Sequence, residues 1–319
     1  MTTNQYFFAA GLSKLAKSLK GDEHIHAGMR PYGFHIGNKL PLIVYPILLG
    51  NEMRKRGIEP RFRYSISLND WDTDSYLPIK NYPMNLVPKG YSFQYQKDTH
   101  GCHNSRVDHW ESVIEDEIKI LREKMPNVRC DIIRVSSLKR NDSFLRVMRF
   151  GLDYPEKILA IIKENMKIDV LSIPAQFVGS VCKSCFSIKG LTSYSKENDK
   201  VCFICSKCRN KQETLVWEQD YWIYVHLLGA AKNAALRPDI WIFGGDFITS
   251  DSIIFHKAVY EASLGYPLRQ KHLFTTVLLG PDGQKMSKSI GNLADIPLNE
   301  LIKKVDGWNH FELGIYSHN

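Results

Sequence analysis

Short segments with strand-like alternation take turns with longer segments of helical spacing along most of the chain. Alternating apolar and polar side chains are typical of a half-buried strand, and apolar positions three and four residues apart are typical of an amphipathic helix. Five short segments predict strands, at residues 26–30, 61–68, 128–135, 239–243 and 272–279. Four longer segments predict helices, at residues 39–56, 106–124, 219–231 and 252–264. This alternation predicts an α/β fold with a parallel sheet.

Two segments interrupt the alternation. Residues 70–105 are rich in Pro, Gly, Asn, Tyr and Asp and predict a long irregular connection, which inside a domain is usually functional. Residues 175–214 hold five of the seven cysteines. The simplest assembly therefore has a first βα half at residues 1–170, an insert at 171–214 and a second βα half at 215–319.

Composition narrows the class of protein. The chain has 319 residues, 44% hydrophobic and 24% charged, which excludes a disordered tail protein or a coiled-coil rod. Lys plus Arg is 42 and Asp plus Glu is 34, so the net charge is 42 − 34 = +8, which suits a polyanionic partner or serves solubility alone. The longest apolar run, residues 40–49, is half of the roughly 20 residues that a membrane span needs. The spacing of Phe8, Leu12, Leu15 and Leu19 favours an amphipathic first helix over a transit peptide, so we expect a cytoplasmic protein without a membrane segment.

The segment Phe34-His35-Ile36-Gly37-Asn38 stands where a predicted strand and turn give way to a helix. His35 and Asn38 are three residues apart and share one helix face, and Gly37 removes side-chain bulk between them. A helix N-terminus offers unpaired N–H groups and the positive end of its dipole to an anion, so two neutral donors beside it suit a triphosphate. The alternative is that His35 is satisfied in a polar core and Asn38 caps the helix.

A second candidate for phosphate binding follows the last predicted strand and a Gly-flanked turn. It is the loop Lys285-Met286-Ser287-Lys288-Ser289. Its two lysines and two hydroxyls could close over phosphates and stabilise negative charge as it shifts to pyrophosphate. The alternative is a solvated basic loop.

Gly244-Gly245-Asp246 ends the strand predicted at residues 239–243. Glycines at such a place let the backbone approach a ligand, and the carboxylate can accept hydrogen bonds from ribose hydroxyls. The alternative is a glycine-rich turn in which the aspartate caps the next helix.

The cysteine spacing in the insert predicts a structural zinc site. Cys182-x-x-Cys185 and Cys205-x-x-Cys208 are 19 residues apart, close to a known four-cysteine zinc pattern. Four thiolates close a tetrahedral site with no open position. Two alternatives stay open: Cys202 replaces one of the second pair, or the cysteines form a reduced cluster without metal. The basic side chains around the pairs offer a surface for nucleic acid, at Lys183, Lys189, Lys207, Arg209 and Lys211.

With HIGN near one end and KMSKS near the other, the sequence resembles the class I aminoacyl-tRNA synthetases. The resemblance implies a Rossmann-type catalytic domain that joins an amino acid to ATP, with Mg²⁺, to form an aminoacyl-adenylate and pyrophosphate. It implies that His35 and Asn38 contact the ATP phosphates and that Lys285 and Lys288 stabilise the transition state. The nucleotide site would also include Gly37, Gly244, Gly245, Asp246, Met286, Ser287 and Ser289.

Residues 8–300 resemble the class I lysyl-tRNA synthetases in particular. The similar features are HIGN in place of the commoner HIGH, the segment from Gly101 to Ser105 followed by His109 and Trp110, and the cysteine-rich insert. About 30 residues follow Ser289, so we expect the helical anticodon-binding region of that family to be absent. A second departure is the acidic and aromatic segment from Asp70 to Tyr76, where the family usually has basic residues.

These segments supply candidates for substrate binding. Asp70 and Asp72, with Asp74, could bind the ammonium group of a cationic substrate, or they are solvated turn carboxylates. His103 and His109 could be ligands or donors, or they are buried structural histidines.

The favoured hypothesis is ATP-dependent activation of an amino acid, lysine or a relative, followed by transfer to tRNA. An alternative is a tRNA-independent ligase that passes the aminoacyl group to a small molecule or a carrier protein. A second alternative is a nucleotide-binding regulator without catalysis.

Overall fold

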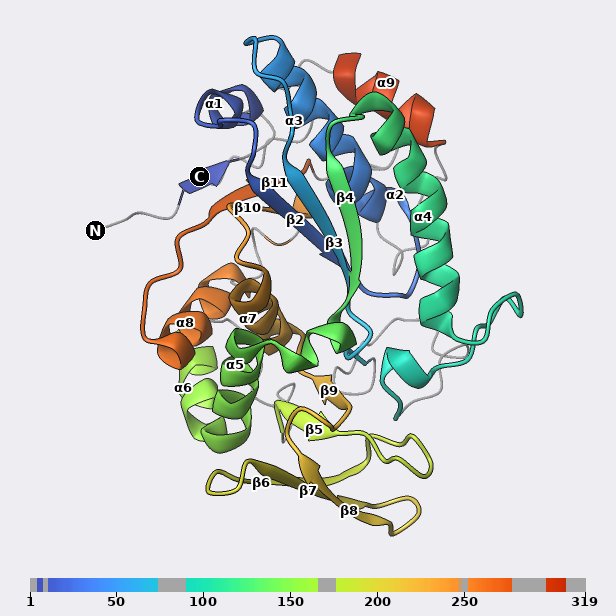
Figure 1. The fold of residues 1–319 in the computed structure, drawn as a ribbon, viewed down its shortest axis with the longest axis vertical. Coiled ribbons are helices and arrows are strands. Elements are labelled where there is room, and N and C mark those ends of the chain that lie inside the picture. Colours follow the sequence, from blue (N-terminus) through green and yellow to red (C-terminus); the bar gives the residue numbers. More distant parts are fainter. Residues whose placement is uncertain are drawn as a thin grey trace.

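A six-stranded, wholly parallel sheet forms the centre of the computed structural model (Figure 1). The structure describes residues 5–7, 11–73, 90–165, 176–245, 247, 252–276 and 297–307. The strand order is β1-β11-β10-β2-β3-β4. The strands of this sheet are β1 (Gln5–Phe7), β2 (His24–Met29), β3 (Arg63–Leu68), β4 (Arg129–Arg134), β10 (Ile240–Phe243) and β11 (Lys271–Phe274).

The order of the strands reverses beside β2. From β2 the chain moves outward to β3 and β4, and it returns on the other side of β2 with β10 and β11. In chain order these five strands are arranged 3-2-1-4-5, the doubly wound, Rossmann-type arrangement. The predicted α/β fold is therefore confirmed, and the unpredicted β1 adds a sixth strand beside β11. Folds of this type bind ligands outside the carboxyl ends of the strands at the reversal, here between β2 and β10.

One face of the sheet is largely apolar. Alternate residues of β3, Tyr64, Ile66 and Leu68, lie in a core cluster with Ile25 and Ala27 of β2. Complete burial of one such side chain stabilises the fold by about 1.5–3 kcal/mol. The helices that contribute to this cluster are α1 (Leu12–Lys17), α2 (Ile36–Lys39), α3 (Tyr45–Arg54), α4 (Arg106–Lys124) and α9 (Leu298–Gly307).

The other face is polar where it meets the helices. His26, Ser65 and Ser67 are buried there, between the aliphatic positions of their strands. This face is covered by a group of four helices that pack on one another, seen together below the sheet in Figure 1. They are α5 (Asp142–Asp153), α6 (Pro155–Asn165), α7 (Val225–Leu236) and α8 (Ser252–Leu264).

Two of the predicted helices have the bounds that we expected, and two differ. The helices predicted at 106–124 and 252–264 are α4 and α8. The helix predicted at 39–56 contains a π-helical segment, Leu40–Val44, between α2 and α3. Pro41 and Pro46 have no N–H to donate, which disrupts regular α-helical bonding. The start predicted for the helix at 219–231 is wrong, because Tyr221–Ile223 forms strand β9 with a partner about 40 residues earlier.

The insert lies at the opposite end of the molecule from α1 and α9 (Figure 1). Strand β5 (Val178–Ser180) pairs with β9 at its base, and three antiparallel strands form the rest. These are β6 (Gly190–Ser195), β7 (Lys200–Cys205) and β8 (Lys211–Leu215).

Two short 3₁₀ helices, Phe93–Tyr95 and Val135–Arg140, complete the elements in the described ranges. The division of the chain at residues 170 and 214 stays a prediction. No helix in the described ranges combines the length and the apolar character needed to cross a membrane.

Candidate nucleotide site and metal centre

The HIGN segment forms a capped helix start just beyond the carboxyl end of β2. His35 has extended backbone angles, and its Nδ1 accepts a hydrogen bond from the Gly37 N–H at 3.1 Å. In return, Asn38 Oδ1 accepts from the His35 N–H at 3.3 Å. A Cβ at position 37 would lie only 3.0 Å from His35 Cε1, so glycine leaves room for the histidine ring. Asn38 therefore caps the helix, as the alternative interpretation of this segment predicted, and His35 is its N-cap residue. Contact of either side chain with ATP stays a prediction.

Gly244 and Gly245 lie on the other side of the strand reversal, just beyond the carboxyl end of β10. The Gly245 N–H donates to Thr275 Oγ1 at 3.2 Å, and the Thr275 N–H donates to the Phe243 carbonyl at 2.9 Å. These bonds tie the glycine turn to the segment that follows β11. Because β2 and β10 are neighbours, the HIGN segment and the glycine turn follow the two strands at the reversal, where folds of this type have their ligand crevice. Asp246 and the loop residues Lys285, Met286, Ser287, Lys288 and Ser289 lie outside the described residues.

The two predicted substrate carboxylates are buried rather than solvated. Asp72 is fully buried, and its oxygens accept from Arg30 Nε at 2.5 Å and Arg30 Nη2 at 3.1 Å. Asp70 Oδ1 accepts from the Ser136 N–H at 2.9 Å, and its Oδ2 has no hydrogen-bond partner among the described residues. Burial raises the pKa of Asp70 to about 6. The interpretation as solvated turn carboxylates is therefore wrong for Asp70 and Asp72, whereas Asp74 lies outside the described residues. Substrate binding stays a prediction.

A buried lysine near this crevice was not identified from the sequence. Lys232 of α7 is only 4% exposed, and its Nζ donates to Asn69 Oδ1 at 2.8 Å and Ser67 Oγ at 3.1 Å. It also lies 5.2 Å from the centre of the Trp241 ring. Gly28 of β2 makes the approach possible, because a Cβ there would lie 2.8 Å from the ammonium nitrogen. Burial lowers the pKa of Lys232 to about 7. The available signal was a lysine on the buried side of an otherwise apolar helix.

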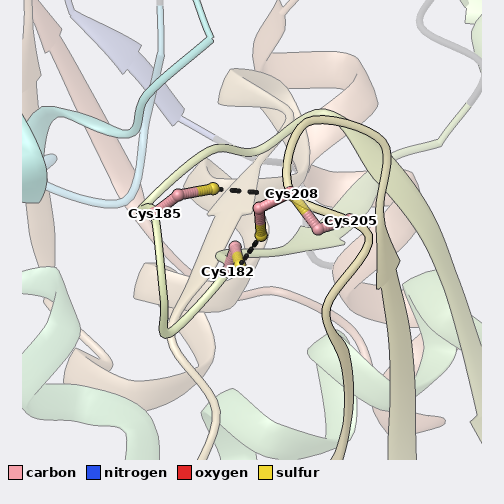
Figure 2. A group of neighbouring side chains, drawn as sticks. All are labelled: Cys182, Cys185, Cys205 and Cys208. Carbon is pink, nitrogen blue, oxygen red and sulfur yellow. Dashed lines mark hydrogen bonds between the residues drawn. The ribbon is translucent and has the colours of Figure 1, made fainter.

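The four predicted zinc ligands converge from two matching turns of the insert (Figure 2). Cys182 Sγ lies 3.5 Å from Cys208 Sγ, and Cys185 Sγ lies 3.6 Å from Cys205 Sγ. In a tetrahedral site the sulfurs would be about 3.8 Å apart, since each Zn–S bond is about 2.3 Å long. The two measured distances are close to this value, and all four sulfurs lie within 4.8 Å of one another, so the four cysteines suit a zinc ion.

The two cysteine turns have the same backbone form. The Phe186 N–H donates to the Cys182 carbonyl, and the Arg209 N–H donates to the Cys205 carbonyl. The residue after each second cysteine, Phe186 or Arg209, has a positive φ, 57° or 62°. Cys202 lies on β7 opposite Ser193 and Glu213 and is not part of the group. Of the two cysteine sets considered, the geometry therefore selects the one without Cys202.

His103 and His109 lie together, but in a different set of contacts from Asp70 and Asp72. Each has its Nδ1 at 3.1 Å from Cys102 Sγ. His103 is exposed, and His109 lies early in α4 with its side chain 12% exposed. The interpretation as two buried histidines is therefore wrong for His103. Binding of substrate by this pair stays a prediction.

The parallel sheet and the strand reversal define a doubly wound α/β protein, a class of fold that often binds nucleotides at the reversal. A sequence model of the family described as "tRNA synthetases class I (K)" matches residues 6–304. The chain belongs to this family, which is a family of ligases that use ATP. The resemblance inferred from the motifs is thereby confirmed.

Curated relatives include lysine–tRNA ligases of two archaea. The chain is 27% identical over 178 residues to the enzyme of Thermococcus kodakarensis, covering 52% of this chain and 31% of that protein. It is 23% identical over 150 residues to the enzyme of Pyrococcus horikoshii, covering 45% of this chain and 26% of that protein. The matched segments therefore span less than one third of the length of these relatives.

Similar solved structures include two other synthetases. The tyrosyl-tRNA synthetase of Archaeoglobus fulgidus, solved with L-tyrosine, has 16% identity and a TM-score of 0.43, covering 94% of this chain and 73% of that one. A glutamate tRNA ligase of Elizabethkingia meningosepticum has 14% identity and a TM-score of 0.38, covering 85% of this chain and 52% of that one.

Proposed function

We propose that the chain activates an amino acid, lysine or a relative, with ATP and Mg²⁺ and transfers it to tRNA. The observation that carries the proposal is the capped HIGN helix start at the strand reversal, with the Gly244–Gly245 turn across from it. Membership of the synthetase family supports the reaction class. The particular amino acid and the acceptor are left to a pyrophosphate-exchange and charging experiment.

The proposed chemistry assigns a role to each element of the crevice. The substrate carboxylate attacks the α-phosphorus of ATP, an O–P bond forms, and the bond to pyrophosphate breaks. The helix N-terminus with His35 and Asn38 holds the phosphates, since its N–H groups and dipole favour negative charge. Gly244 and Gly245 let the backbone approach the adenosine, and Asp246 accepts from its ribose. Lys285 and Lys288 stabilise the negative charge on pyrophosphate, where a bound Mg²⁺ would add its own positive charge.

For a cationic amino acid, Asp70 is a better candidate than Asp72 to accept the ammonium group. Its Oδ2 has no hydrogen-bond partner in the described part of the chain, whereas Arg30 already pairs with both oxygens of Asp72. An ammonium group beside Asp70 would compensate a buried carboxylate whose isolation is costly.

We also propose that Cys182, Cys185, Cys205 and Cys208 hold a structural zinc ion. The donor set fits, because four thiolates at tetrahedral spacing are typical of closed zinc sites. The ion would fix the two cysteine turns relative to each other. The exposed basic side chains nearby would then form a stable surface for the tRNA backbone.

The test is ATP–pyrophosphate exchange across a panel of amino acids, with and without total tRNA. Exchange that requires tRNA, followed by charging, supports the proposal in full. Exchange without tRNA identifies the amino acid but not the acceptor. A charging assay then distinguishes a tRNA-charging enzyme from a tRNA-independent ligase. The absence of exchange in both arms, with the protein folded, contradicts the proposal and favours the regulator.

A matched pair of variants makes the test specific to the catalytic loop. Lys288→Ala should lower the exchange rate by about 10²-fold or more while ATP binding changes little, because its charge acts mainly in the transition state. Lys119→Ala removes one exposed lysine of α4 and should leave exchange unchanged. Equal losses of exchange and ATP affinity in Lys288→Ala would refute the role given to this lysine.

A further inference from the structure

A cavity of about 460 Å³ lies between the insert and the group of four helices. Its walls come from α5, from the turn between β6 and β7 at residues 196–199, and from the end of α8. That turn lies beneath α5, at the end of the insert opposite to Cys205, because β7 runs from the turn to this cysteine (Figure 1). No residue of the lining belongs to the crevice or to the cysteine turns. Volumes of roughly 300–1,000 Å³ are usual for sites that bind small molecules.

One wall of the cavity is fixed by an ion pair between α5 and the insert. Arg149 donates through Nε and Nη2 to the two carboxylate oxygens of Asp199, at 2.8 and 2.6 Å. Tyr194 of β6 donates its hydroxyl to the same carboxylate at 2.8 Å. A two-bonded arginine–carboxylate pair of this kind has a well-defined geometry. The wall is therefore formed before any ligand binds.

Positive charge remains at the rim of the cavity. Arg146, one turn before Arg149 on α5, is exposed and donates to the Leu264 carbonyl at 3.3 Å. Among the described residues it pairs with no carboxylate. Lys196 is 71% exposed and lies 3.9 Å from Asp153, a long, exposed pair of a kind that contributes little. Both cationic side chains are therefore available to an anion.

Aromatic rings lie beside this charge. Phe150, Tyr154 and Tyr194 line the cavity. The Nζ atoms of Lys157 and Lys196 lie 4.1 and 6.0 Å from the centre of the Tyr154 ring. Aromatic rings in a cationic groove are typical of sites for single-stranded nucleic acid, where bases stack on the rings and the cations contact phosphates. A bare anion would use the cations alone, whereas a nucleotide uses both.

We propose that this cavity binds a nucleotide unit, with its phosphate on Arg146 and Lys196 and its base against the rings of Tyr154 and Tyr194. The unit is a free nucleoside monophosphate or an unpaired nucleotide of RNA, which share this chemistry. RNA as the source rests on the proposed function, because it adds a second contact with tRNA at the other end of the insert from the cysteine turns. Binding of the nucleotide unit itself does not depend on the proposed function.

Photo-crosslinking locates the nucleotide directly. The probes are 5-iodouridine 5′-monophosphate and a short single-stranded RNA that carries one 5-iodouridine, each irradiated with the full chain. Mass spectrometry of the digested protein should find the label on the peptide that contains Tyr154 or on the peptide that contains Tyr194. Label from the RNA alone identifies RNA as the source, and label from the monophosphate identifies a site for free nucleotides. Label at other places only, from both probes, would overturn the proposal.

Equilibrium binding of the same probes tests the contacts in variants whose folding is checked by thermal unfolding. Arg146→Ala and Tyr154→Leu should each weaken binding about fivefold or more, since the first loses a phosphate contact and the second a stacked base. Tyr154→Phe keeps the ring and should bind as the wild type does, as should Lys119→Ala on α4.

Two results would overturn the nucleotide site even if a probe binds. One is unchanged affinity in both Arg146→Ala and Tyr154→Leu. The other is displacement of the probe by an equal concentration of inorganic phosphate, which would leave a site for anions alone. If nucleotide binding behaves as expected but pyrophosphate exchange is absent, the proposed function fails and the cavity stands.

Discussion

His35 caps the start of α2 and is also predicted to contact the ATP phosphates. Two substitutions distinguish these two roles. Its Nδ1 caps the helix through the Gly37 N–H. Asparagine is a good N-cap, so His35→Asn should keep the stability of the wild type, whereas His35→Ala should lose about 1 kcal/mol. Both should lower pyrophosphate exchange by about 10²-fold, since each removes the donor that would face the phosphates. Thermal unfolding and exchange rates of the two variants check this; an active His35→Asn would reduce the role of His35 to capping.

Lys232 predicts a pH dependence of stability. Burial lowers its pKa to about 7, well below the ordinary lysine value. Between pH 7 and pH 10 the folded chain leaves it largely neutral, while the unfolded chain protonates it. The unfolded state therefore binds more protons, and the contribution of Lys232 to stability rises with pH, by up to about 1.4 kcal/mol per pH unit.

Urea unfolding at pH 7 and pH 9 measures this contribution. The difference in unfolding free energy between wild type and Lys232→Met should shift by about 2 kcal/mol in favour of the wild type at the higher pH. Lys163→Met, at an exposed position of α6, should show no such shift. If both differences stay constant with pH, Lys232 is protonated in the folded state.

At the scale of elements, the insert depends on its cysteine turns. Its three strands are short, and much of their surface is exposed, as at Leu191 and Ile204, which are 71% and 48% exposed. Cys182→Ser should therefore lose one zinc ion and unfold the insert, while the main sheet keeps its fold. Cys202→Ser, at a cysteine outside the group, should keep the zinc and the wild-type melting temperature. A stable, zinc-loaded Cys182→Ser would contradict the structural site.

The helices that were predicted with the right bounds have sequence patterns that mark where they begin or end. Helix α4 begins after Ser105, whose Oγ accepts from the Asp108 N–H while Asp108 accepts from the Ser105 N–H, and this capping pattern is readable in the sequence. Strand β9 carries no such signal. Its three apolar residues fit a helix or a strand equally well, and the strand forms because β5 supplies a partner about 40 residues away. Tertiary contacts therefore determine whether a short apolar segment of this kind forms a strand or a helix.

At the scale of the whole molecule, the sequence predicted the layers but not the buried charges. Alternating strands and helices imply a parallel sheet, and motif positions imply where its ligand edge lies. The Arg30–Asp72 pair and the contacts of Lys232 with Ser67 and Asn69 join segments 42 and more than 160 residues apart. No local pattern encodes such partners.

The charge distribution makes the proposed binding of tRNA testable through its dependence on salt. The net charge is +8, and all five basic residues near the cysteine turns are exposed, Lys183, Lys189, Lys207, Arg209 and Lys211. If these side chains bind phosphates, tRNA affinity should fall steeply as salt rises, since each neutralised phosphate releases condensed counterions.

Lys183→Glu with Arg209→Glu should weaken binding at low salt and lower the slope of log affinity against log salt by about 1 for each phosphate that is no longer neutralised. Lys119→Glu changes the charge by the same amount per residue on α4, away from the insert, and should leave the slope unchanged. Filter binding or fluorescence anisotropy over a salt series measures all three proteins. Equal slopes for the insert variant and the wild type would place the tRNA-binding surface elsewhere on the molecule, and salt-independent binding would contradict recognition of the tRNA backbone altogether.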